Sequence, residues 1–132
     1  MTDTTGRGAS PGGFRHSEIG VGGDAQTERL STLLDLQAAQ PAVIRLRDWA
    51  FERLAPMPGE TAVDVGSGTG ANTARLAATV DPGGSATGVE PNPALREVAA
   101  RRAQATGSTA VFVDGTAGAL PLPDASADVL VC

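Results

Sequence analysis

The stretch AVDVGSGTGANT, residues 62–73, places Gly66, Gly68 and Gly70 directly after a short apolar run that contains an aspartate. Glycine adopts backbone angles that other residues avoid, and without a side chain it lets a ligand rest on the main chain. A helix that begins after such a loop turns its free N–H groups toward that ligand. The pattern predicts a strand, a loop that binds a nucleotide-like ligand, and a helix. A tight turn without a ligand is the plainer alternative.

Beyond residue 60, strand patterns alternate with helix patterns, which indicates an α/β fold with a mostly parallel sheet. Two helices are expected before this part, over residues 24–40 and 41–55, because leucines and other apolar residues recur there at helical spacing. Asp24 suits the cap of the first helix. The expected strands are 61–65, 85–90, 109–113 and 128–132, and the expected helices between them are 71–80 and 91–107.

Apolar spacing also predicts which side of each helix is buried. In the second helix, Leu46 and Leu54 belong to an apolar stripe that Phe51 widens. In helix 91–107, Arg96 and Arg102 are expected to face outward.

Acidic residues follow the expected strands. Glu90 ends the second strand, where a carboxylate can bond both hydroxyls of a ribose. Both NAD sites and adenosyl sites use this arrangement, so loop and acid together indicate an adenosine-containing ligand without separating the two. Asp64 precedes the loop, where a dinucleotide site usually has an apolar residue, and it suits a ligand with a positive amino group. Asp114, followed by Gly115, can accept from an adenine amino group, although Asp-Gly also forms plain turns.

Four stretches, VDVGSGTG, GVEPNP, DGTAGALPLPD and ADVLVC, follow one another between residues 63 and 132. In order and spacing they resemble the first four motifs of the class I S-adenosylmethionine-dependent methyltransferases. The most similar members are small-molecule enzymes such as those of ubiquinone and menaquinone biosynthesis. The resemblance implies a Rossmann-like, doubly wound fold and S-adenosylmethionine as the cofactor.

The resemblance gives the loop residues specific roles. It implies that Asp64 and the Gly66 backbone hold the amino end of the methionine moiety. Gly68 and Gly70 would let the cofactor lie on the loop, and Ser67, which stands where this family often has cysteine, belongs to the same cofactor-binding set.

The second half of the implied site reads the nucleoside. Glu90, which stands where aspartate is frequent, would bind the ribose hydroxyls. Asp114 and Gly115 would read the adenine, and Pro91 and Asn92 would border its pocket.

These patterns divide the chain into three parts. Residues 1–23 are rich in Gly, Ser and Thr and are expected to be a disordered tail. Residues 24–55 are expected to form a helical lid, and residues 56–132 the cofactor-binding domain. The family's sheet normally has seven strands, so four strands imply a C-terminally truncated fragment that is inactive by itself.

Composition limits the partners. The net charge is −5, and the ten positive residues, all arginine, are scattered, which disfavours a nucleic-acid partner. One cysteine and one histidine offer little for a metal site, and no apolar run is long enough to span a bilayer. A cytoplasmic protein that methylates a small molecule is expected. No catalytic residue can be assigned, and the oligomeric state stays open. The alternatives are an NAD(P)-binding oxidoreductase domain and a non-catalytic cofactor-binding remnant.

Overall fold

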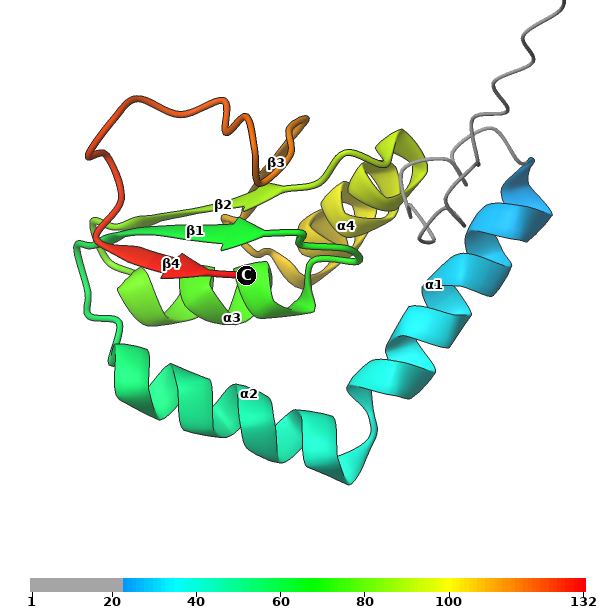
Figure 1. Cartoon of the computed structure of the whole chain (residues 1–132), viewed down its shortest axis with the longest axis horizontal. Coiled ribbons are helices and arrows are strands. Elements are labelled where there is room, and N and C mark those ends of the chain that lie inside the picture. The colour runs from blue at the N-terminus through cyan, green and yellow to red at the C-terminus, as the bar shows by residue number, and fades with distance from the viewer. Residues whose placement is uncertain (1–22) are drawn as a thin grey trace, which may run out of the picture.

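The computed structural model describes residues 23–132, so the expected disordered tail falls almost entirely outside the described residues. The first elements are helices α1 (Asp24–Ala38) and α2 (Pro41–Leu54). They are followed by β1 (Thr61–Val65), α3 (Ala71–Val80), β2 (Ser85–Val89), α4 (Pro93–Thr106), β3 (Val111–Val113) and β4 (Val129–Val131) (Figure 1). The expected elements are therefore confirmed to within two residues at each end.

The four strands form one parallel sheet in the order β3-β2-β1-β4. Val63 in the middle of β1 lies opposite Thr87 of β2 and Leu130 of β4. The chain winds from β1 outward to β3 and then returns to the other side of β1. The strand order therefore reverses beside β1, and ligands of open α/β sheets bind at such a point, outside the carboxyl ends of the strands. The Rossmann-like α/β prediction is confirmed.

One face of the sheet carries the apolar core. Helix α3 packs on this face, and Leu76 and Val80 are completely buried there. Burying a side chain of this size stabilises the fold by about 1.5–3 kcal/mol. The buried cluster comprises Ala62, Leu76, Ala77, Val80, Ala86 and Val129. This packing fixes the loop that joins β1 to α3, because both of its ends are anchored in the core.

The other face is covered by the segment between β3 and β4, residues 114–128, which arches over the strands (Figure 1). A cavity of about 500 Å³ lies under this segment, with Val63, Leu122 and Leu130 among its lining residues. The two faces of the sheet therefore differ: helix α3 seals one, and an irregular segment covers the other.

Helices α1 and α2 lie outside the sheet, α2 near α3 and α1 near α4 (Figure 1). Gly23 is the residue before the first turn of α1, so the prediction that Asp24 caps this helix is wrong. Asp24 is instead the first helical residue, where its charge is favourable at the positive end of the helix dipole.

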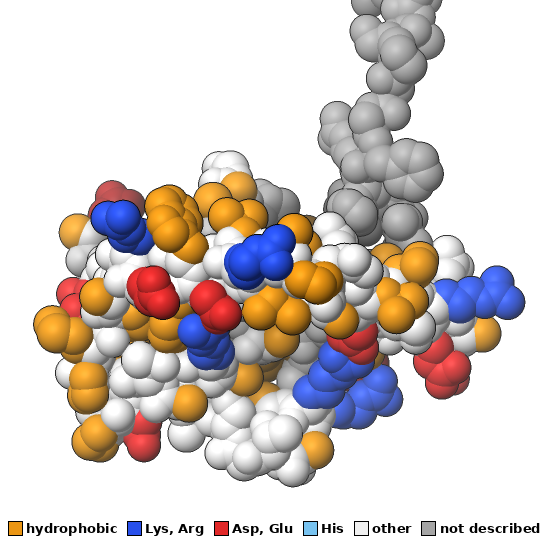
Figure 2. Space-filling model, turned by 90° about the horizontal axis from the view of Figure 1, so that it is seen from below, with side chains coloured by type: hydrophobic (Ala, Val, Ile, Leu, Met, Phe, Trp, Pro, Cys, Tyr) orange, Lys and Arg blue, Asp and Glu red, His pale blue; other side chains and the backbone are white. Residues whose placement is uncertain are grey.

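The expected apolar stripe of α2 is only partly buried. Phe51 packs against the core cluster, but Leu46 is 62% exposed and Leu54 is also exposed. Figure 2 shows the molecule from below, with hydrophobic side chains separated by charged ones. The prediction of a buried stripe was wrong for Leu46 and Leu54, because the half-buried face of α2 consists of Val43, Arg47, Ala50 and Phe51.

Ion pairs attach the two helices to the α/β part. Asp35 of α1 accepts two hydrogen bonds of 2.8 Å from Arg102 of α4. Asp48 of α2 accepts a bond of 2.7 Å from Arg75 of α3, and the Arg75 guanidinium lies 4.0 Å from the centre of the Phe51 ring. Arg102 was expected to face solvent, and it is half exposed while it holds α1. No helix in the described part of the chain is long and apolar enough to cross a membrane.

Candidate cofactor-binding site

The carboxyl ends of β1, β2 and β3 bring the predicted residues to one edge of the sheet. The loop after β1 is tied to β2, because the N–H groups of Gly66 and Ser67 donate to the Val89 carbonyl at 2.8 and 3.2 Å. Parallel pairing thereby places the loop beside Glu90, which follows Val89 directly. Motifs that follow one another along the chain therefore lie side by side at this edge of the sheet.

The glycines of the loop have different tasks. Gly66 has φ +75°, and a side chain added to it would meet open space, so its backbone is accessible to a ligand. Gly70 has φ +85° and begins α3, and an added Cβ would lie 2.6 Å from the Phe112 ring. The first glycine therefore leaves the main chain open, whereas the third allows close packing of the helix onto β3.

Asp64 is buried beneath the start of α3, with 4% of its surface exposed. The Thr73 hydroxyl donates to its carboxylate at 2.7 Å. Burial raises the pKa of the Asp64 carboxyl, and the bonds from Thr73 and the positive charge of Arg47 oppose that rise. Thr73 thus satisfies one oxygen of the carboxylate. A positively charged ligand would favour its ionised form further.

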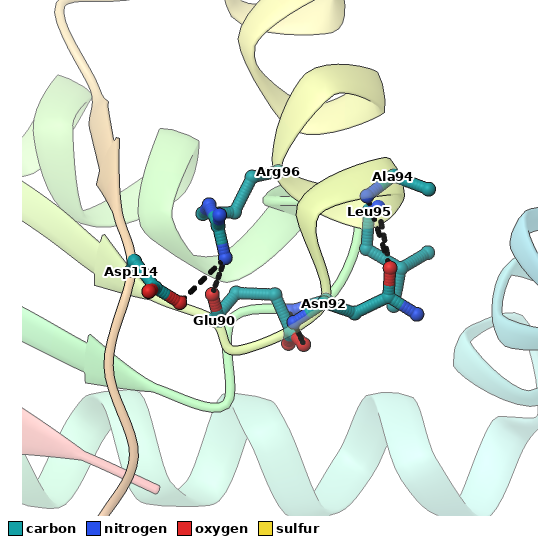
Figure 3. Close-up of polar contacts among 7 residues, drawn as sticks. Glu90, Asn92, Ala94, Leu95, Arg96 and Asp114 are labelled. Carbon is teal, nitrogen blue, oxygen red and sulfur yellow. Dashed lines mark hydrogen bonds and ion pairs between the residues drawn. The ribbon is translucent and has the colours of Figure 1, made fainter. Parts of the chain in front are cut away.

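Glu90 is also buried and connects the loop to the start of α4. One carboxylate oxygen accepts from the Gly68 N–H at 2.9 Å, and the other accepts from the Asn92 N–H at 2.9 Å. Asn92 in turn caps α4 by accepting from the N–H groups of Ala94 and Leu95 (Figure 3). Within residues 23–132 the Asn92 side-chain N–H₂ has no hydrogen-bond partner, although the residue is 1% exposed.

The end of β3 supplies the remaining predicted residues. Asp114 accepts from Arg96 at 2.8 Å, and the same guanidinium nitrogen donates to the Glu90 carbonyl at 2.6 Å (Figure 3). The prediction that Arg96 faces solvent is therefore wrong, because polar acceptors at the strand ends hold it. A side chain at Gly115 would collide with Pro121 at 2.7 Å, so glycine is required there. Pro91, between the ribose acid and the helix cap, is half-buried.

A cavity of about 170 Å³ opens between the glycine loop and the two N-terminal helices. Asp64 borders it from β1, and Arg47 borders it from α2. The other lining residues are Leu34, Asp35, Gln37, Ala38, Val43, Gly66, Ser67, Gly68, Thr69, Ala71 and Asn72. Ser67 thus borders the cavity, and its hydroxyl is buried and has no partner among the described residues. Glu90 and Asp114 do not line this cavity.

Arg47 is the site residue that sequence reasoning missed. It is half-buried, lines the cavity, and forms no ion pair within residues 23–132. It lies four residues after Val43 and four before Phe51, so helical spacing places it on the half-buried face of α2. That spacing is the available signal, but a charged residue does not count toward an apolar stripe. A carboxylate, a guanidinium and exposed loop N–H groups around one cavity suit a ligand end that carries both a positive amino group and a carboxylate.

Comparisons with known proteins place this chain in a family. The methyltransferase domain family matches residues 62–132, which is more than half of the chain. Protein-L-isoaspartate O-methyltransferase of Aeropyrum pernix is 45% identical over 57 residues, which are 43% of this chain and 22% of that protein.

Solved structures agree on the fold. A putative S-adenosyl-L-methionine-dependent methyltransferase from Methanococcus maripaludis superposes with a TM-score of 0.65 at 19% identity, over 93% of this chain and 52% of that one. An RNA methyltransferase from Salinibacter ruber, solved in complex with S-adenosyl-L-homocysteine, gives 0.55 at 24% identity, over 65% and 55%. The chain thus spans between about a fifth and about half of the length of these proteins. The motifs, the order of the strands and the match to the family over residues 62–132 all lead to the same conclusion: the chain belongs to the methyltransferase domain family.

Proposed function

We propose that this chain binds S-adenosylmethionine and transfers its methyl group to a small molecule. The observation that carries the proposal is the cavity that has the Asp64 carboxylate and the Arg47 guanidinium on its walls, next to the glycine loop. A dinucleotide would place a pyrophosphate at this loop, and the buried Asp64 carboxylate would repel it. The methionine end of S-adenosylmethionine carries an amino group and a carboxylate, which match the charges of Asp64 and Arg47 on the two sides of the cavity.

The size of the cavity supports the same arrangement. A volume of about 170 Å³ is below the roughly 300–1,000 Å³ of pockets that enclose a whole small ligand. The methionine end of the cofactor would occupy it, with the amino group at Asp64 and the carboxylate at Arg47. The adenosine would extend over the strand ends, with the ribose at Glu90 and the adenine near Asp114 and Gly115. The N–H₂ of buried Asn92, which has no partner among the described residues, fits this polar part of the site.

The residues of the chain contribute binding and orientation to the reaction. S-adenosylmethionine supplies a methyl group on a positively charged sulfur, so the methyl donor is already activated when it binds. The loop, Asp64 and Arg47 would hold the donor in one orientation, and fixed orientation is a large part of catalysis in such a transfer. We further propose that residues 24–54 act as a lid, because α1 and α2 supply one wall of the cavity and exclude water.

A small-molecule acceptor is our choice because of charge. A net charge of −5 opposes binding of nucleic acid. The acidic, cysteine-poor composition also suits a cytoplasmic protein. We therefore place the reaction in the cytoplasm. The Aeropyrum pernix relative is named for a protein substrate, so an isoaspartyl peptide is the comparison that tests the choice.

Isothermal titration calorimetry tests the cofactor. S-adenosylmethionine and S-adenosylhomocysteine are titrated beside NAD and NADP, and we expect only the first two to bind. Replacing Glu90 with Ala should weaken S-adenosylhomocysteine binding by about 1–3 kcal/mol, because the ribose hydroxyls lose the carboxylate that accepts their hydrogen bonds. Glu97→Ala, on the exposed side of α4, is the matched control. Binding of NAD or NADP alone would overturn the proposal in favour of an oxidoreductase domain.

Transfer of a labelled methyl group tests the reaction. The chain is incubated with labelled S-adenosylmethionine, metabolite pools and an isoaspartyl peptide, and the label is followed into each fraction. Label in a small molecule supports the proposal, and label in the peptide alone contradicts the acceptor class. Cofactor binding without any transfer would favour a non-catalytic cofactor-binding domain.

A further inference from the structure

Arg96 departs from the pattern of its helix. Among the arginines of α4, it has 22% of its side chain exposed, against 66% for Arg101. It lies in the first turn of α4, which is separated by three residues from the end of β2 at Val89. Its side chain extends across the carboxyl ends of β2 and β3 instead of into solvent (Figure 3).

One nitrogen of Arg96 makes both of its contacts. It donates to the Glu90 carbonyl at 2.6 Å and to one oxygen of the Asp114 carboxylate at 2.8 Å. A terminal guanidinium nitrogen carries two hydrogens, so both bonds form at the same time. Hydrogen bonds from a charged donor are short and strong, and these two join the ends of neighbouring strands.

The two partners differ in how much they need Arg96. Glu90 is already fixed, because its N–H donates to the Val113 carbonyl at 3.0 Å and its carboxylate is bonded to the loop. The side chain of Asp114 is 74% exposed, and Arg96 is its only polar partner among the described residues. Without Arg96, that carboxylate would turn freely in water and lose rotational entropy only when it binds a ligand.

We infer that Arg96 is a positioning residue that sets the preference of this site for a 6-aminopurine. It holds one oxygen of Asp114 against the strand end and leaves the other oxygen to accept from the exocyclic amino group. The inference rests on the proposed function, since it takes Asp114 to be the adenine-reading acid. The alternative is that Arg96 and Asp114 form a surface ion pair that adds a little stability and does not affect ligand affinity.

The test compares two ligands that differ in that amino group. S-adenosylhomocysteine has it, and S-inosylhomocysteine has an oxygen in its place. We expect the unchanged chain to bind the adenosyl compound about ten- to a hundred-fold more tightly, in keeping with one charge-assisted hydrogen bond. Arg96→Ala should reduce this ratio several-fold by weakening the adenosyl compound alone. Arg96→Lys, which keeps a charged donor, should restore part of the ratio.

Controls separate positioning from stability. Arg101→Ala removes an exposed arginine of the same helix and should leave the ratio unchanged. In an Asp114→Ala background, the further change Arg96→Ala should not alter the ratio, because the residue that Arg96 positions is gone. Equal losses for both ligands in Arg96→Ala, or an unchanged ratio in both Arg96 variants, would overturn the inference. Should Arg96→Ala fail to fold, Arg96→Lys is compared with and without Asp114→Ala, and a ratio that Arg96→Lys lowers only when Asp114 is present supports the inference.

A failure of the proposed function can be distinguished from a failure of this inference. If the proposed function is wrong, the unchanged chain binds neither ligand, so no ratio of affinities can be measured. Binding of both ligands with equal affinity by the unchanged chain would contradict the role of Asp114 and, with it, the inference about Arg96.

Discussion

Asp64 combines the charge that we propose binds the cofactor with a structural cost. It is buried beneath α3, and Thr73 satisfies one of its oxygens. Burial is the main reason that its pKa is raised. Since the folded protein binds this proton more tightly than the unfolded chain does, the charged carboxylate lowers stability. The cost is absent below the ordinary aspartate pKa, grows as the pH rises toward the raised pKa, and is fully present above it.

Replacing Asp64 with Asn should therefore separate binding from stability. Asn keeps an oxygen for the Thr73 hydroxyl but carries no charge, so we expect the unliganded variant to melt at a higher temperature than the unchanged chain near pH 7. The difference should shrink as the pH approaches 4. Affinity for S-adenosylhomocysteine should fall about ten- to a hundred-fold, as for a lost charged hydrogen bond. Thermal melts with and without the ligand give both results, and a variant that is less stable at pH 7 would contradict this account.

Arg47 offers a second test at the residue scale, because it faces the same cavity from α2. Arg47→Ala should weaken S-adenosylhomocysteine about tenfold or more, since the carboxylate of the ligand loses its cation. Binding of methylthioadenosine, which lacks that carboxylate, should stay within twofold. Arg45→Ala on the exposed side of α2 is the matched control. Calorimetry with the two ligands decides, and equal losses for both would show that Arg47 supports packing only.

The residues that can be predicted from the sequence are those whose task is local. A positive φ at Gly66 and a carboxylate at the end of a strand, as at Glu90, follow from the chain near each residue. The positions of Arg47 and Arg96 depend on contacts between elements. Helical spacing predicted that Arg96 faces solvent, because it does not show that the Glu90 carbonyl and the Asp114 carboxylate lie at the neighbouring strand ends.

At the scale of elements, a half-exposed ion pair attaches α1 to α4. Ser31 is the one buried side chain of this helix among the described residues. Asp35 accepts two hydrogen bonds from Arg102 and lies 3.5 Å from the Thr69 hydroxyl of the glycine loop. The bonds from Arg102 are the main reason that the pKa of Asp35 is lowered. Helical spacing predicted α1 correctly, but it does not show its attachment, because Asp35 and Arg102 are 67 positions apart in the sequence.

Replacing Asp35 with Asn should loosen α1. The pair is half exposed, so we expect a loss of about 0.3–1 kcal/mol, together with faster hydrogen exchange over residues 24–38. A lowered folded pKa means that the pair stabilises the protein above the ordinary aspartate pKa, and that this stability is lost as the pH falls through the lowered value. The difference in melting temperature between the variant and the unchanged chain should thus be larger at pH 7 than at pH 3.

Glu28→Gln is the control for this change, since Glu28 is an exposed acid of the same helix with no side-chain ion pair in the described residues. It should alter neither exchange nor melting. Unchanged exchange over α1 in Asp35→Asn would show that apolar contacts, and not the ion pair, hold the helix.

At the scale of the whole molecule, the proposed site joins the α/β part to the two N-terminal helices. The α/β part contributes Asp64 and the glycine loop, and the helices contribute Leu34, Val43 and Arg47. A sequence predicts each part by its own periodicity, but it does not show that they meet at one cavity. A cofactor in that cavity would touch both parts, so its binding free energy would be shared between the lid and the sheet.

Hydrogen exchange with saturating S-adenosylhomocysteine tests this coupling. At a ligand concentration of 100 times Kd, the bound state is stabilised by about 2.7 kcal/mol, or about a hundred-fold in exchange for amides that open only by global unfolding. We expect slower exchange over residues 31–54 as well as over the loop, residues 66–73. Arg47→Ala should lose the slowing in α2 while keeping it near Glu90, because the nucleoside half of the site is unchanged. Protection of the loop alone in the unchanged chain would mean that α1 and α2 do not close over the cofactor, since a wall that contacts the ligand has to open before its amides exchange.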